Sequence, residues 1–127
     1  MLANKPKLRL LIVDDNSSFL KLFAKLFTSY FMEFIETIDT APNGYECIQK
    51  VLKQPYDIVF MDMDMPVMNG VEATKYINQN FRGIIVIAVS LNSELEHIKQ
   101  MLEAGARNYI IKEKINKEYI QHLLEKY

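Results

Sequence analysis

The chain has 127 residues, of which 15 are basic and 16 acidic, so its formal net charge is −1. This length fits one compact domain, and the near balance of charge argues against a nucleic-acid interface built from a broad basic surface. A single cysteine, Cys47, excludes an internal disulfide framework and a cysteine-rich zinc site.

Neither membrane insertion nor secretion is indicated by the sequence. No apolar run approaches the roughly 20 residues that a helix needs to span a bilayer. The N-terminus, MLANKPKLRLLIVDD, reaches carboxylates after a very short apolar stretch, whereas a secretory signal needs a longer apolar core and a small-residue cleavage site. We therefore expect a cytoplasmic domain.

Short apolar runs rich in Ile and Val alternate with stretches of helical periodicity. The runs lie at residues 8–13, 57–61, 84–89 and 108–111, with a weaker one at 34–40. Around them, apolar residues recur at intervals of three and four over 19–31, 47–52, 71–77, 95–102 and 115–127. Runs that are apolar on nearly every residue are typical of strands covered on both faces. The pattern therefore predicts an α/β fold, (βα)5, in which a doubly wound parallel sheet lies between helices.

Local signals mark where some of these helices begin and end. Ser93 with Glu96, and Asn69 with Glu72, have the spacing of a capping box, in which each side chain bonds to the backbone amide of the other residue. Gly105 lies where the fourth helix should stop.

Polar residues follow the predicted strands at their carboxyl ends, where open parallel sheets bind their ligands. Taken singly, each aspartate is as well explained as a helix cap or a turn residue. Together they predict one rim that gathers carboxylates, a hydroxyl and an ammonium. These residues are Asp14 and Asp15 after the first strand, Asp62 and Asp64 after the third, Ser90 at the end of the fourth and Lys112 after the fifth.

Such a rim favours a bound cation, because crowded carboxylates raise one another's pKa values unless a positive charge lies among them. Hard oxygen ligands with no histidine or cysteine nearby favour Mg2+, which needs few protein carboxylates and leaves positions for phosphoryl oxygens. Lys112 adds a compensating charge and Ser90 a hydrogen-bond donor. The set predicts phosphoryl transfer, in which positioning and charge neutralisation carry most of the catalysis.

With these features, the chain resembles the receiver domain of two-component response regulators over essentially all of its length. The segments LLIVDDN and MDMDMPVMNGVEA are fairly specific to that family, and five such segments in the right order are highly specific. The segments are LLIVDDN at 10–16, APNGYEC at 41–47, MDMDMPVMNGVEA at 61–73, IVIAVS at 85–90 and GARNYIIK at 105–112. The resemblance implies a flavodoxin-like, five-stranded sheet of strand order 2-1-3-4-5.

The resemblance also implies a role for each residue of the rim. Asp62 would be the phosphoacceptor, taking a phosphoryl group from a phosphohistidine and becoming an acyl phosphate. Asp15, Asp62 and the main-chain carbonyl of Asp64 would bind Mg2+, with Asp14 reaching the ion through water. Lys112 would pair with the phosphoryl oxygens. Ser90 would turn its hydroxyl toward the phosphoryl group, and Tyr109 would then rotate inward as the switch.

By the same resemblance, the partners would be a sensor histidine kinase or a histidine phosphotransfer protein upstream. A downstream protein would bind the surface of the fourth helix, fifth strand and fifth helix; a homodimer is left open, and no direct nucleic-acid contact or membrane insertion is implied. The chain would be a single receiver domain over 1–127 without an output domain. One departure concerns Glu113, which follows Lys112 where many receivers carry a proline in a cis bond. A cis bond before another residue costs about 2.5–4 kcal/mol, so we expect a trans peptide there.

Two other functions remain open at this stage. Asp62-Met63-Asp64 after an apolar strand resembles the DxD pair of haloacid-dehalogenase-type phosphatases, although that family places its pair on the first strand. A receiver-like interaction module that no longer accepts phosphate is the other alternative, and the intact constellation argues against it. A flavodoxin-like FMN binder is disfavoured, because Asp14 and Asp15 would put anions where phosphate should bind.

Overall fold

The computed structural model describes residues 5–127 as one five-stranded parallel sheet with helices on both faces. The strand order is β2-β1-β3-β4-β5, which confirms the expected (βα)5 topology. The elements in chain order are β1 (Leu8–Val13), α1 (Ser17–Tyr30), a 3-10 turn (Met32–Phe34), β2 (Ile35–Ala41), α2 (Gly44–Lys53), β3 (Ile58–Met61), α3 (Gly70–Asn80), β4 (Ile85–Ser90), α4 (Leu95–Ala104), β5 (Asn108–Ile111), a second 3-10 turn (Lys112–Lys114) and α5 (Lys117–Lys126).

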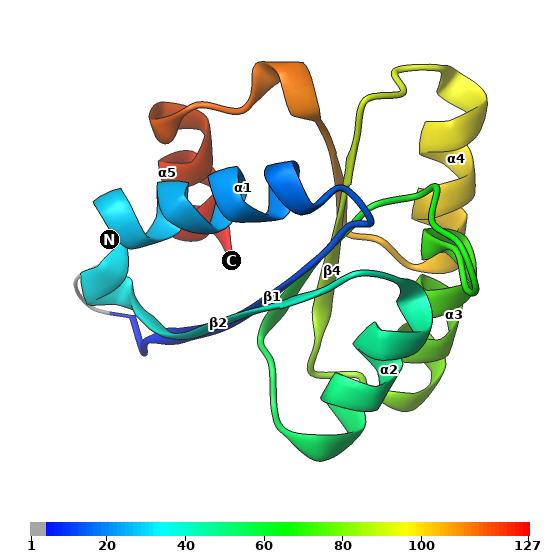
Figure 1. Cartoon of the computed structure of the whole chain (residues 1–127), viewed down its shortest axis with the longest axis horizontal. Coiled ribbons are helices and arrows are strands. Elements are labelled where there is room, and N and C mark those ends of the chain that lie inside the picture. The colour runs from blue at the N-terminus through cyan, green and yellow to red at the C-terminus, as the bar shows by residue number, and fades with distance from the viewer. Residues whose placement is uncertain (1–4) are drawn as a thin grey trace.

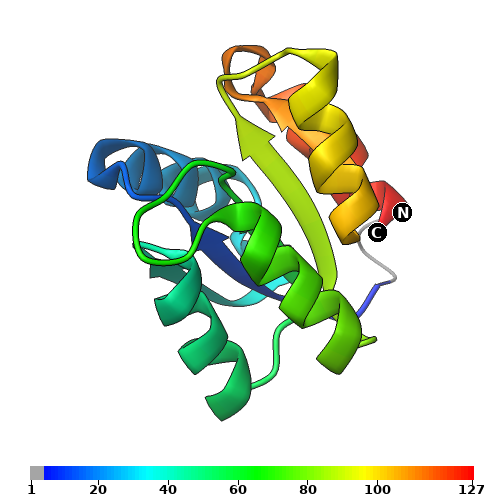
Figure 2. The same ribbon diagram turned by 90° about the vertical axis from the view of Figure 1, so that its right-hand side faces the viewer.

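The helices form two layers around the sheet. Helices α1 and α5 lie on one side of the strands, and α2, α3 and α4 on the other (Figures 1 and 2). Alternate residues of β1 accordingly pack into different cores: Leu10 and Ile12 face α1 and α5, whereas Leu11 and Val13 face α2 and α3. Burial on both faces explains why the strands read as continuous apolar runs.

The ends of the helices agree with most of the local signals. Asn69 and Glu72 form the predicted capping box of α3, and Gly105 ends α4 with a φ of 123°. The predicted capping box of Ser93 and Glu96 is wrong, because the N-cap of α4 is Glu94 and makes no side-chain cap bond. The Asn92 side chain instead accepts a hydrogen bond from the Glu94 amide at 2.9 Å, so an asparagine turn starts this helix.

Helix α4 contacts the rest of the domain through a narrower face than its periodicity predicts. Met101 is buried, but Leu95 and Leu102 are 80% and 45% exposed. The helix packs mainly on α3 and on β5, which is an edge strand, and an edge position covers less of a helix than the centre of the sheet does. Among residues 5–127 no helix is both long and apolar enough to cross a membrane.

The loop between β3 and α3 contains one residue in an unfavourable backbone conformation. Val67 has a φ of 71° and its side chain is 81% exposed. A β-branched residue in the left-handed region is costly, whereas asparagine tolerates it.

We therefore expect Val67→Asn to raise the free energy of unfolding by about 0.5–1.5 kcal/mol, as measured by urea denaturation. The control is Leu91→Asn, which replaces another exposed apolar loop residue but not one with a positive φ. It should change stability by less than about 0.5 kcal/mol. A stabilisation of the same size in both variants would refute strain at Val67.

Candidate active site: an acidic cavity at the carboxyl ends of the strands

One cavity of about 420 Å³ lies at the carboxyl edge of the sheet. Its walls come from the segments after β1, β3, β4 and β5, which are remote from one another in sequence. Of the predicted site residues, all except Tyr109 line it. The full lining is Asp14, Asp15, Asn16, Asp62, Asp64, Ser90, Leu91, Asn92 and Lys112.

The register of β1 and β3 brings the two buried aspartates side by side. Val13 is paired with Met61, the last residue of β3, so Asp14 and Asp62 leave neighbouring strands at the same level. The Asp62 amide donates to the Val13 carbonyl at 2.9 Å, and the Asp14 amide donates to the Ala41 carbonyl of β2 at 3.1 Å. These backbone bonds hold both residues on the sheet.

The acidic residues form a donor set that fits a divalent cation. Carboxylate oxygens of Asp14, Asp15 and Asp62 all lie within 4.8 Å of one another. Asp14 and Asp62 are buried, whereas Asp15 is exposed, so the set has two fixed oxygens and one open toward solvent. Three hard anionic oxygens at this spacing suit Mg2+. Asp64 lines the same cavity, with its side chain exposed.

The Asp62 carboxyl has the most perturbed environment of the cluster. Burial raises its pKa to about 7. The negative charge of Asp14 adds to this rise, and the positive charge of Lys112 opposes it. The Met63 amide donates to Asp62 Oδ1 at 2.9 Å, so this oxygen is held in place. A buried carboxyl with a raised pKa that lines a cavity beside a lysine ammonium is a candidate functional group.

Lys112 enters the cavity from the end of β5. Its Nζ lies 2.6 Å from Asp14 Oδ2, and the two side chains are 12% and 1% exposed. The same nitrogen lies 4.2 Å from the centre of the Phe19 ring. The peptide bond to Glu113 is trans as expected, since residues 5–127 contain no cis peptide bond.

Ser90 and Tyr109 are connected through the backbone of one loop residue. Ser90 Oγ accepts a hydrogen bond from the Asn92 amide at 3.1 Å, and the Tyr109 hydroxyl donates to the Asn92 carbonyl at 2.8 Å. Ser90 is buried and Tyr109 half-buried. Tyr109 therefore reaches the cavity through the β4–α4 loop rather than by lining it.

Sequence reasoning missed the roles of Gly70 and Asn92 at this site. A Cβ atom on Gly70 would lie 1.9 Å from the Asp62 carbonyl oxygen, so only glycine lets the start of α3 approach the strand end that carries Asp62. Gly70 is part of the segment that resembles the family, which was the available signal. For Asn92 no sequence signal pointed to this role, because its bonds to Ser90 and Tyr109 are made by its main chain.

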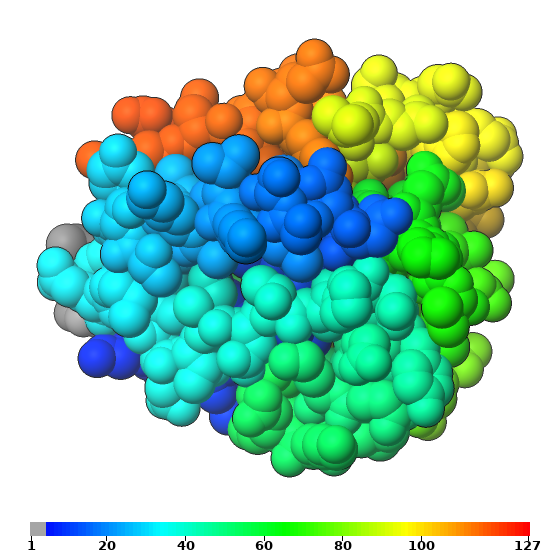
Figure 3. All heavy atoms as spheres, in the orientation of Figure 1, coloured from blue at the N-terminus to red at the C-terminus, as the bar shows by residue number. Residues whose placement is uncertain are grey.

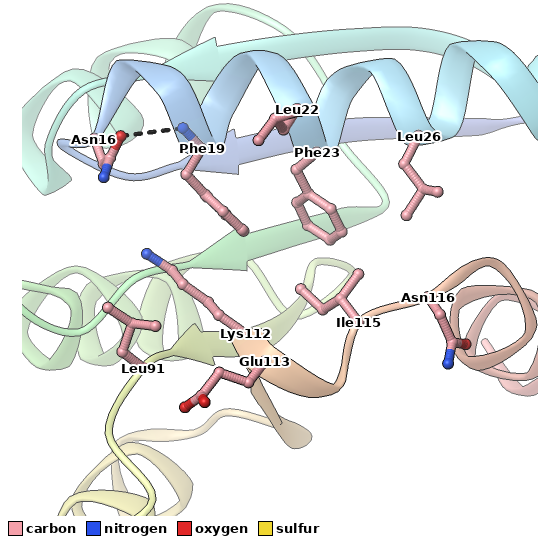
Figure 4. Close-up of a pocket in the computed structure, with 10 residues that line it drawn as sticks. All are labelled: Asn16, Phe19, Leu22, Phe23, Leu26, Leu91, Lys112, Glu113, Ile115 and Asn116. Atoms are coloured by element: carbon pink, nitrogen blue, oxygen red, sulfur yellow. Dashed lines mark hydrogen bonds between the residues drawn. The ribbon is translucent and has the colours of Figure 1, made fainter.

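A second cavity of about 450 Å³ adjoins the acidic one, between α1 and the segment after β5 (Figure 4). Both cavities share Asn16, Leu91 and Lys112 in their linings. The remaining wall is mostly apolar and includes Phe19, Phe23, Leu26 and Ile115. In the space-filling view, α1 (blue) lies against the orange residues that follow β5 (Figure 3).

Comparison with known proteins finds one matching family. Residues 10–125 match the family model of the response regulator receiver domain. Among curated proteins, the chain is 30% identical over 111 residues to the transcriptional regulatory protein DegU of Brevibacillus brevis, covering 87% of this chain and 46% of DegU. It is 29% identical over 126 residues to the signal transduction histidine-protein kinase BarA of Shigella flexneri, covering 98% of this chain but 13% of BarA. The chain thus spans less than half the length of either relative.

Solved structures give the same match. A chain in the crystal structure of the CheX–CheY–BeF3–Mg2+ complex from Borrelia burgdorferi aligns with a TM-score of 0.84 and 27% identity. The alignment covers 99% of this chain and 92% of that one.

The raised pKa of Asp62 predicts how stability depends on pH in the absence of metal. Its folded pKa of about 7 lies above the ordinary value of 3.8. The folded state therefore binds more protons than the unfolded state between these values, and the free energy of unfolding falls as pH rises through this range. We expect Asp62→Asn in EDTA to be more stable than the parent by at least about 1 kcal/mol at pH 8, and by less at pH 5, as measured by urea denaturation.

Asp57→Asn is the control for this pH dependence. Hydrogen bonding to Arg9 holds the pKa of Asp57 below its usual value, so Asp57 stays ionised at both pH values. Its substitution should destabilise the protein equally at pH 5 and pH 8. If the parent and Asp62→Asn show the same slope of stability against pH, Asp62 does not have a raised pKa.

The close approach of Gly70 to Asp62 predicts a large effect of one methyl group. Gly70→Ala should lower the free energy of unfolding by about 2–3 kcal/mol, because α3 or the end of β3 must move. Gly83→Ala is the matched control, since a Cβ there meets nothing within 4 Å, and it should cost less than about 0.5 kcal/mol. Equal stability of the two variants in thermal or urea unfolding would contradict this contact.

Proposed function

The chain belongs to the response regulator receiver domain family, and on that premise we propose that it accepts a phosphoryl group on Asp62 from a phosphohistidine. The donor would be a sensor histidine kinase or a histidine phosphotransfer protein. The observation that carries the proposal is that Asp62, three further aspartates and Lys112 line one cavity. We further propose that residues 1–127 act as one receiver unit in the cytoplasm.

The transfer we propose is an attack by Asp62 Oδ2, because Oδ1 is held by the Met63 amide. A bond forms between this oxygen and phosphorus, while the P–N bond of the donor breaks and its electron pair returns to the imidazole. The product is a mixed anhydride on Asp62. Attack requires the ionised carboxylate: burial raises the pKa of Asp62, and the positive charge of Lys112 opposes that rise.

A cation is part of this proposal. Asp15, Asp62 and the main-chain carbonyl of Asp64 would hold Mg2+, with Asp14 bound through water, and the clustered carboxylate oxygens support this choice. When bound, the ion supplies neutralisation of the carboxylates and of the phosphoryl oxygens. The ammonium of Lys112, now paired with Asp14, would turn to the phosphoryl oxygens.

Signalling would pass through Ser90, Asn92 and Tyr109. A phosphoryl group adds about −1.5 to −2 charge and strong acceptor oxygens, so it attracts the Ser90 hydroxyl as a donor. Rotation of that hydroxyl weakens its bond from the Asn92 amide and shifts the carbonyl that holds Tyr109. The Tyr109 ring would then settle inward, altering the α4–β5–α5 surface that a downstream protein binds. Since a ligand shifts an equilibrium only by its differential affinity, the two forms must lie within a few kcal/mol of each other.

We propose no turnover of a separate substrate. The phosphoryl group would leave only by hydrolysis of the anhydride on Asp62, so one molecule would carry at most one group at a time. A DxD phosphatase would instead hydrolyse many molecules of a small phosphate ester per chain.

The test is intact-mass measurement after incubation with phosphoramidate and Mg2+. The parent should gain the mass of one phosphoryl group and stop there, and Asp62→Asn should gain none. In EDTA the parent should label at a rate lower by at least about tenfold, because the charge neutralisation is lost.

The Asp64→Asn variant tests which of the two aspartates of this loop, Asp62 or Asp64, accepts the phosphoryl group. It removes a carboxylate from the same cavity and should still gain one phosphoryl group. Labelling of Asp62→Asn but not of Asp64→Asn would move the acceptor to Asp64. Continuous hydrolysis of p-nitrophenyl phosphate would favour the phosphatase, and no labelling of the parent would favour an interaction module.

A further inference from the structure

The Lys112 ammonium lies between a carboxylate and an aromatic ring. Its Nζ is 2.6 Å from Asp14 Oδ2 and 4.2 Å from the centre of the Phe19 ring. A charge with so little exposure to water needs close partners, and one carboxylate oxygen cannot satisfy the three donors of an ammonium. The negative face of the ring supplies a second attraction, and such contacts are strongest where water is excluded.

The Phe19 ring is itself held in place. Asn16, the N-cap of α1, accepts a hydrogen bond from the Phe19 amide at 3.1 Å, and the ring projects from there toward Lys112 (Figure 4). It stacks on Phe23 with ring centres 5.2 Å apart. Phe23 meets the buried Phe60 edge-on at 5.1 Å. Since Phe60 precedes Asp62 by two residues in the chain, the ring beneath Lys112 is linked by packing to the strand that carries Asp62.

The backbone of Lys112 does not by itself determine where the charge lies. A lysine side chain is a long flexible stem with a compact charge at its end, and Lys112 is the first residue of a single 3-10 turn (Lys112–Lys114). Lateral contact with a fixed surface limits the positions that the ammonium can take.

We propose that Phe19 is a positioning residue for Lys112. Its ring keeps the ammonium at the wall of the acidic cavity, within reach of Asp14 and of an arriving phosphoryl group. The inference rests on the phosphoacceptor function proposed above, and it assigns to α1 a part in that chemistry beyond packing the core.

The first test compares labelling rates with phosphoramidate and Mg2+. Phe19→Leu keeps an apolar side chain but removes the π face, and we expect a threefold to tenfold lower rate, equivalent to about 0.7–1.4 kcal/mol. Phe19→Tyr keeps the π face and should label within about twofold of the parent. Since tyrosine also conserves the packing volume of the ring, 4-cyanophenylalanine at position 19 separates the two roles: it keeps the ring and weakens its π face, so a role in packing alone predicts parent-like labelling there.

Tyr30→Leu is the matched control on the same helix. The Lys117 Nζ lies 4.7 Å from the centre of the Tyr30 ring, so this variant removes the same kind of contact away from the cavity. Its labelling rate should equal that of the parent. A loss as large as that of Phe19→Leu would overturn the specific role of Phe19.

The second test is spectroscopic and does not depend on phosphorylation. In 13C–1H spectra of the metal-free protein, the ring current of Phe19 should move the Lys112 methylene signals next to Nζ upfield. Loss of those signals in Lys112→Met assigns them. The shift should persist in Phe19→Tyr and disappear in Phe19→Leu.

These two measurements separate the inference from the proposed function. A parent that does not label at all refutes the phosphoacceptor function, while the methylene shift still decides whether Phe19 holds Lys112. An unshifted Lys112 signal in the parent, or parent-like labelling of Phe19→Leu, overturns the inference. Should Phe19→Leu lose its native circular dichroism, 4-cyanophenylalanine at position 19 preserves the ring shape, weakens the π face and should also lower the rate.

Discussion

Repulsion among like charges is the constraint around which this site is arranged. Carboxylate oxygens of Asp14, Asp15 and Asp62 lie within 4.8 Å of one another, and two of these residues are buried. Within residues 5–127 the close ion pair that offsets this charge joins Lys112 to Asp14. Burial raises the pKa of Asp62, and the charge of Asp14 raises it further, against the opposing charge of Lys112. A divalent cation or an added proton would relieve the remaining repulsion.

The residues of the site are held by different parts of the fold, some by the sheet and some by a loop. Asp14 and Asp62 follow central strands and are fixed by backbone hydrogen bonds to neighbouring strands. Ser90 ends β4, and its hydroxyl bonds to a loop, where Asn92 links it to Tyr109. Asp14 and Asp62 are therefore held by the sheet, whereas Ser90 and Tyr109 are joined by two hydrogen bonds to one loop residue, Asn92. This division suits a switch, since rearrangement of a loop costs less than rearrangement of a sheet.

Much of the fold could be predicted because the local signals and the tertiary contacts agree. The predicted strands lie within one residue of β1 to β5, since runs apolar on every residue are stable only when both faces are covered. The differences from the prediction concern α4 and the turn that starts it. Leu95 and Leu102 have helical spacing but are exposed because α4 packs at the edge of the sheet. Ser93 has a suitable capping partner in sequence, but the Asn92 side chain starts the turn instead.

The sequence by itself determined the (βα)5 parallel sheet and which polar groups meet, because parallel strands end at a common edge and the residue after each strand can be read directly; the strand order followed from the family resemblance. Asp14, Asp15, Asp62, Asp64, Ser90 and Lys112 were all identified in this way. Only the tertiary structure decided how these groups are held: the ring of Phe19 beneath Lys112, the main chain of Asn92 between Ser90 and Tyr109, and the absent Cβ of Gly70 against Asp62. The physical reason is that these contacts depend on the distance between elements packed across the sheet, which no local pattern of residues specifies.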